Sequence, residues 1–182
     1  MTSVTALPFS RPLTRADLED TPDDGHRYEL IDGVLIVSPG PQLPHQDMVG
    51  NLYLLLRGAC PPELKVVLAP FDVVLADDTV LEPDLLVAPR TQFTRRDLPG
   101  APLLAVEVAS PSTRRIDRLL KRDRLQAAGA MSYWLVDPDE PSVTVLELRD
   151  GVYETVAHVV ADQTADVLLP FPVRLVPSAL LD

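Results

Sequence analysis

The chain has 182 residues, of which 46% are hydrophobic, and its formal net charge is −11 at pH 7. This length suits one domain that buries its own core, and the apolar runs are too short to span a bilayer. The net negative charge repels a polyanion, so any nucleic-acid activity must depend on a local basic stretch or on metal ions.

The N-terminal region and the cysteine content bear on the expected location. The first twenty residues lack the basic-then-apolar pattern of a signal peptide. The single cysteine, Cys60, has no partner for an internal disulfide and excludes a cysteine-based zinc cluster. We therefore expect a cytoplasmic protein that does not enter a membrane, with a loose arm at residues 1–12 and one domain at residues 13–182.

Local signals predict the elements of the N-terminal half. The segment LTRADLED predicts a short helix with Thr14 as N-cap and Asp17 in a capping-box arrangement. Asp32-Gly33 separates two apolar runs, as in a hairpin with a type I′ turn. A helix that stops before Pro61-Pro62 is predicted by apolar residues at helical spacing: Met48, Val49, Leu52, Leu55 and Leu56.

The C-terminal half alternates further strands with one helix. KVVLAP, FDVVLADD and EPDLLVAP resemble strands, and LLAVEVAS is apolar on both faces, as is typical of a central strand. A helix is predicted from Ser112 or Thr113 to Gly129, followed by the strand SYWLVDP. A second hairpin turns at Asp150-Gly151, and PSALLD predicts a final helical turn. This order predicts an α/β or α+β fold, in which helices flank a mixed β-sheet that carries additional hairpins.

Three charged residues stand where the pattern expects apolar or neutral ones. Asp84 opens the strand DLLVAP, Glu107 lies inside LLAVEVAS, and Lys121 is on the helix that follows. If the two strands pair, both carboxylates can point to one end of the sheet, and the helix can bring Lys121 over them. Two adjacent carboxylates repel each other unless a cation is present, and their oxygens suit Mg²⁺ or Mn²⁺.

Such a cluster has the minimum equipment for cutting a phosphodiester. A divalent ion lowers the pKa of a bound water and braces a phosphate oxygen. A nearby lysine can orient that water or stabilise the charge that develops on the phosphate.

Several motifs together resemble a known family. YELIDG, EPDLLV, VEVASPST, the helix with Asp117 and Lys121, and GAMSYWLVDP are similar to the Uma family of predicted endonucleases. That family belongs to the restriction-endonuclease-like, PD-(D/E)XK superfamily, and the resemblance covers roughly residues 13 to 160. It implies a restriction-endonuclease-like core, a metal-dependent endonuclease, DNA as partner and pairing as a homodimer.

The resemblance also assigns residues. Pro83-Asp84 matches the PD element and Glu107 the acidic residue of (D/E)XK, which makes Asp84 and Glu107 the expected metal ligands. The usual lysine position holds Ala109, and Lys121 resembles the migrated lysine of many superfamily members. Glu29 resembles a further acidic catalytic residue, and two additional candidates for the site are His45 and Asp117.

Simpler interpretations of the same residues remain open. Glu107 could be a sheet-end carboxylate satisfied by hydrogen bonds, and Asp84 a strand cap. Lys121 could face solvent in a helical pair with Asp117, beside an apolar stripe. Five arginines surround Lys121 in the sequence, and their simplest interpretation is a solvated face with acidic partners, although some could meet phosphates: Arg114, Arg115, Arg118, Arg122 and Arg124.

Two other functions compete with an endonuclease. The net charge and Ala109 motivate a catalytically inactive binding or regulatory protein with the same fold. An acidic surface also suits a metal-dependent hydrolase of smaller phosphate esters.

Overall fold

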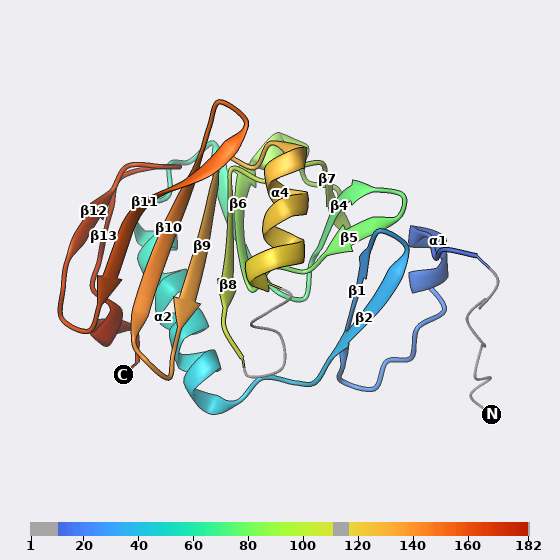
Figure 1. The fold of residues 1–182 in the computed structure, drawn as a ribbon, viewed down its shortest axis with the longest axis horizontal. Coiled ribbons are helices and arrows are strands. Elements are labelled where there is room, and N and C mark those ends of the chain that lie inside the picture. Colours follow the sequence, from blue (N-terminus) through green and yellow to red (C-terminus); the bar gives the residue numbers. More distant parts are fainter. Residues whose placement is uncertain (1–10, 111–116, 182) are drawn as a thin grey trace.

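A six-stranded sheet forms the centre of the computed structural model, which describes residues 11–110 and 117–181 (Figure 1). The strand order is β11-β10-β9-β8-β6-β3. Neighbouring strands are antiparallel except β8 and β9, which run parallel, so the sheet is mixed. Its strands are β3 (Leu64–Leu68), β6 (Leu85–Pro89), β8 (Leu104–Val108), β9 (Ser132–Asp137), β10 (Ser142–Arg149) and β11 (Val152–Val160).

A second sheet of five strands has the order β2-β1-β5-β4-β7. Its strands β4 and β7 are parallel, and its other neighbouring strands are antiparallel. The strands are β1 (Arg27–Ile31), β2 (Val34–Ser38), β4 (Asp72–Ala76), β5 (Thr79–Leu81) and β7 (Asp97–Pro99). A third, antiparallel pair is formed by β12 (Ala165–Val167) and β13 (Val173–Leu175).

Two helices cover opposite faces of the six-stranded sheet. In Figure 1, α4 (Arg122–Ala128) runs alongside β6 and β8 on the side of the second sheet, and α2 (Leu43–Ala59) lies behind β9 and β10. A π-helical turn, η2 (Asp117–Lys121), leads directly into α4. The other helical segments are α1 (Arg15–Leu18), η1 (Arg90–Gln92) and η3 (Pro177–Leu180). No helix within residues 11–110 and 117–181 is long and apolar enough to cross a membrane.

Side chains of the central strand β8 point alternately into two apolar clusters, one on each face of the sheet. Leu104, Val106 and Val108 pack in the cluster that contains the α2 side chains. Ala105 packs in the opposite cluster, with Leu125 of α4. Because side chains alternate along a strand, Glu107 belongs to the same face as Ala105 and points toward the side of the sheet that α4 covers.

Most of the predicted elements are confirmed. The capping box of Thr14 and Asp17 is present, and both hairpins turn through residues with positive φ at Asp32-Gly33 and Asp150-Gly151. Gly129 ends α4 in the left-handed conformation, with φ of 87°. The predicted helix start at residues 112–113 lies outside the described residues, as does most of the predicted arm at 1–12. The five-stranded sheet and the β12-β13 pair were not anticipated.

Gly33 and Gly151 offer a matched test of one packing contact in the second sheet. Both have positive φ in a hairpin turn, but a Cβ on Gly33 would lie 2.5 Å from the Pro12 Cβ, whereas one on Gly151 would meet nothing within 4 Å. The left-handed backbone costs a residue with a side chain about 1–2 kcal/mol at either position. Gly33→Ala adds the clash, so we expect it to lower the free energy of unfolding by at least about 1 kcal/mol more than Gly151→Ala.

Urea unfolding followed by circular dichroism measures both values. Equal losses in the two variants would contradict the packing of Pro12 against this turn.

Candidate active site

The pairing of β6 with β8 brings two of the predicted site residues together. Leu85 stands opposite Val106 in this antiparallel pair, so one step further along the register Asp84 stands opposite Glu107. The Oδ2 atom of Asp84 accepts a hydrogen bond of 2.8 Å from the amide of Val108, next to Glu107. Both carboxylates are about 2% exposed. The strands that carry Asp84 and Glu107 therefore pair, as the predicted shared site requires.

Lys121 lies between two buried carboxylates. Its Nζ atom is 2.8 Å from Oε2 of Glu29 and 3.1 Å from Oε1 of Glu107. All three residues are at most 2% exposed. The contacts join β1 of the second sheet, β8 of the main sheet and the turn before α4. Lys121 therefore does not lie in solvent, and the alternative of a surface pair with Asp117 is wrong for the lysine.

Asp84 is held by a second set of donors. Arg27 NH1 lies 2.6 Å from its Oδ1 and His45 Nε2 lies 3.2 Å from its Oδ2. Burial alone would raise the pKa of Asp84, but the His45 hydrogen bond, the charge of Arg27 and the Val108 amide lower it below its ordinary value. Asp84 is thus an ionised acceptor despite its burial.

Arg27 connects this group to the lysine cluster electrostatically. Burial works to lower the pKa of Arg27, yet the charges of Asp84, Glu107 and Glu29 raise it overall. Three buried carboxylates thus face two basic side chains, Arg27 and Lys121. The excess of negative charge and the hard oxygen donors fit a divalent cation.

The donors closest to such an ion would be few. Residues 11–110 and 117–181 contain no group of three or more acidic, histidine or cysteine side chains arranged to hold a metal. Asp84 and Glu107 on adjacent strands supply two carboxylates. Mg²⁺ is commonly bound by one or two carboxylates together with water and substrate phosphate, so this pair suits it.

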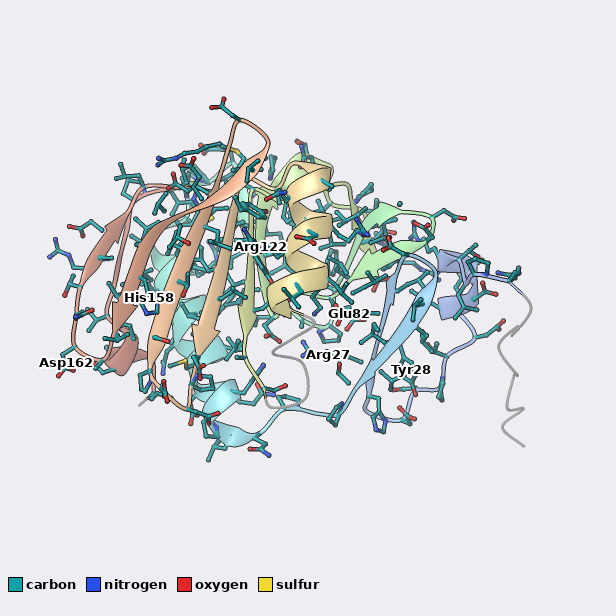
Figure 2. All side chains as sticks on the ribbon, viewed as in Figure 1. Arg27, Tyr28, Glu82, Arg122, His158 and Asp162 are labelled. Atoms are coloured by element: carbon teal, nitrogen blue, oxygen red, sulfur yellow. The ribbon has the colours of Figure 1, made fainter. Side chains whose placement is uncertain are left out.

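Glu82 adds a carboxyl group that is neutral over part of the physiological pH range. Burial, followed by the negative charges of Asp72 and Glu29, raises the pKa of Glu82 from 4.5 to about 7. Burial also raises the pKa of Asp72, although its hydrogen bond with Glu82 opposes this. The backbone amide of Glu82 donates to Oε1 of Glu29 at 2.7 Å. Figure 2 places Glu82 close to Arg27, in the space between α4 and the β1-β2 hairpin.

The sequence signals differed in how well they located these residues. His45 is buried at the start of α2 and contacts Asp84, and Glu29 contacts Lys121, as expected for members of one site. Asp117 begins the π-helical turn, but its side chain lies outside the described part of the structure. Arg27 was not anticipated; its position two residues before Glu29 on the same strand face was the available signal.

Three cavities surround the site. A cavity of about 590 Å³ is lined by Arg27, His45, Glu82 and Asp84 among others. A second, of about 440 Å³, is lined by Glu107 and Ala109, and a third, of about 240 Å³, shares Ala109 with the second and Arg27 and His45 with the first. The candidate residues therefore border space that a ligand can enter.

Comparison with known proteins identifies the family of the chain. The family model described as "Uma2: Putative restriction endonuclease" matches residues 15–179. The chain belongs to the Uma2 family. None of the curated proteins that were compared matches this Uma2-family chain.

A solved structure resembles the chain over nearly its whole length. It is the crystal structure of "a putative nuclease belonging to DUF820" from Anabaena variabilis, with a TM-score of 0.70 and 22% sequence identity. The match covers 93% of this chain and 98% of that one. The likeness bears on the fold, which is restriction-endonuclease-like, with mixed sheets flanked by helices.

Removal of the Lys121 charge tests how the buried cluster depends on it. Lys121→Met keeps the length of the side chain but leaves Glu29 and Glu107 buried without their shared cation. We expect the free energy of unfolding to fall by about 3–5 kcal/mol, as when one partner of a buried ion pair is removed.

The matched control is Arg174→Met, which breaks an ion pair with Asp166 whose side chains are 69% and 64% exposed. That change should cost at most about 1 kcal/mol. Similar losses in both variants, measured by urea unfolding, would mean that Lys121 is not the cation on which the cluster depends.

The raised pKa of Glu82 predicts a pH dependence of stability. A carboxyl group with a folded pKa above its unfolded pKa stabilises the fold fully below about pH 4.5, and this contribution is lost as the pH rises through about 7. Glu82→Gln removes the titration and keeps the backbone bond to Glu29. We expect the variant to lose less stability than the wild type between pH 5 and about pH 8. Parallel pH profiles from thermal unfolding would contradict the assignment.

Proposed function

We propose that this chain is a Mg²⁺- or Mn²⁺-dependent endonuclease that hydrolyses phosphodiester bonds in DNA. The observation that carries the proposal is the contact of Lys121 with Glu107, directly opposite Asp84, in a chain of the Uma2 family. Two paired carboxylates on adjacent strands can hold a metal ion that activates water, and a lysine amine beside them can stabilise charge on the phosphate.

Asp84 and Glu107 would hold the ion, which when bound makes water a stronger nucleophile and offsets the charge of the phosphate. Arg27 and His45 keep Asp84 ionised and fix its orientation. Glu29 holds Lys121 against Glu107, so the ammonium group is in place before substrate arrives. Lys121 then orients the attacking water or stabilises the negative charge that grows on the phosphate oxygens.

The reaction balances with water as the only co-reactant. A bond forms between the water oxygen and phosphorus, and the bond between phosphorus and one sugar oxygen breaks. The attacking water gives up one proton, and the leaving oxygen takes up a proton from the surrounding water.

Ala109 motivates the rival proposal of an inactive binding protein, because it occupies the position where the superfamily usually has lysine. Ala109 follows β8 and its amide donates to the carbonyl of Val136 at 2.7 Å, so its side chain lies on the Glu107 face. The Nζ amine of Lys121, which comes from the turn before α4, contacts Glu107 on this same face. This arrangement favours an active site over an inactive one.

Cleavage of supercoiled plasmid tests the proposal directly. With Mg²⁺ or Mn²⁺, we expect the wild type to nick or cut DNA and both Asp84→Asn and Glu107→Gln to lose at least about a hundredfold in rate, since each removes one charged ligand. Asp166→Asn, an exposed carboxylate on β12, is the control and should retain full activity.

A second readout does not depend on activity. Mn²⁺ binding followed by electron paramagnetic resonance should weaken in the Asp84 and Glu107 variants and not in the Asp166 variant. A wild type that is inert toward all DNA forms with either metal would sink the endonuclease proposal, as would activity that survives both substitutions.

A further inference from the structure

One side of the main sheet beyond α4 carries a polar groove. The cavity of about 440 Å³ runs over β9, β10 and β11 and is called here the β9–β11 groove. In Figure 1 no helix lies in front of these three strands, whereas α2 covers the sheet from behind. Among the residues that line the groove are Glu107, Ala109, Arg122, Asp137, Thr144 and His158.

The groove begins at the candidate active site. Glu107 lines it, and Lys121 and Arg122 are consecutive residues of the same turn. Successive helical residues point in directions about 100° apart, so one cation can reach Glu107 while the next reaches the groove. A ligand in the groove is therefore held next to the groups proposed to carry out the hydrolysis.

Arg122, which lines the groove at the start of α4, has a donor atom without an acceptor among the described residues. Its Nε atom is buried, and within the described part of the chain it has no hydrogen-bond partner. One terminal nitrogen makes a long contact of 3.5 Å with the carbonyl of Tyr153. A buried guanidinium donor without an acceptor is costly, and an anionic ligand in the groove would satisfy it.

His158 and three hydroxyl groups line the other side. His158 on β11 is exposed, and its Nδ1 atom lies 2.9 Å from the Thr144 hydroxyl on β10, directly across the strand pair. Ser142 and Thr155 provide further hydroxyl donors. Figure 2 places Arg122 beside α4 and His158 over β11, so the two nitrogen-bearing side chains come from opposite walls.

Each of the two acidic residues that line the groove is already engaged by donors of the protein. Lys121 contacts Glu107 at 3.1 Å and offsets part of its charge. Asp137 accepts hydrogen bonds from the amides of Asp139 and Glu140, so its carboxylate is engaged by its own turn. The donors on the groove walls are an arginine, a histidine and uncharged hydroxyls, and arginine and hydroxyl groups are usual contacts to phosphate oxygens.

We propose that the β9–β11 groove binds the phosphate backbone of one nucleic acid strand next to the bond to be cut, with Arg122 and His158 contacting phosphates. This inference rests on the proposed function for its choice of ligand. It makes Arg122 and His158 substrate-positioning residues outside the motifs of the family. It also supplies a local site for a polyanion on a protein of net charge −11.

Fluorescence anisotropy of a short labelled single-stranded oligonucleotide tests the groove without cleavage, in EDTA and again in Ca²⁺. We expect Arg122→Gln to weaken binding about tenfold and to reduce the slope of log affinity against log salt by about one. His158→Gln, at an exposed position, should weaken binding severalfold. Arg174→Gln on β13, which packs on the α2 side of the sheet, should bind as the wild type does.

The outcomes separate the groove from the nuclease. Unchanged affinity and salt slope in both groove variants, or no binding by the wild type in either condition, would overturn the groove even if the protein cuts DNA. Arg122-dependent binding without any cleavage would support the groove and overturn the endonuclease. If a mononucleotide binds as tightly as the oligonucleotide, the ligand is a free phosphate ester and the assignment to a polynucleotide strand is overturned.

Discussion

The contact of Lys121 with both Glu29 and Glu107 is the interaction on which the rest of the site depends. It joins the second sheet, the main sheet and the helical turn before α4. A buried ion cluster is a weak source of stability, because desolvation of each charge offsets most of the Coulomb attraction. Its consequence is positional: the ammonium group can satisfy both carboxylates only if the three elements pack in this one arrangement.

The cations of the site are already paired with carboxylates. Lys121 contacts Glu29 and Glu107, and Arg27 contacts Asp84, so the positive charges of the site are offset by their immediate neighbours. The net charge of −11 dominates at long range. For the proposed nuclease, attraction to a phosphate backbone would therefore arise at short range, from a metal ion held by Asp84 and Glu107 and from cations such as Arg122 that line the adjoining groove.

The sequence predicted what local signals determine and missed what distant pairing determines. Asp-Gly turns, a capping box and helical spacing identified both hairpins and α2, because each signal acts within a few residues. The five-stranded sheet depends on pairing between distant strands, so no local pattern predicts it. The orientation of Lys121 was ambiguous for another reason. The π-helical turn η2 shifts the helical phase, so Leu119 and Leu120 are 55% and 44% exposed while Lys121 is buried.

The alanine at position 109 gains a physical meaning from this geometry. The second and third cavities share Ala109 as a lining residue, on the face of β8 that carries Glu107. A lysine there would extend into that junction, whereas the amine of Lys121 enters from the turn before α4 and leaves the strand position small. Moving the lysine from strand to helix thus keeps an ammonium group on Glu107 and preserves open space from Arg27 to the β9–β11 groove. For the proposed endonuclease, this departure from the PD-(D/E)XK pattern is therefore compatible with catalysis and with a longer path for the DNA strand.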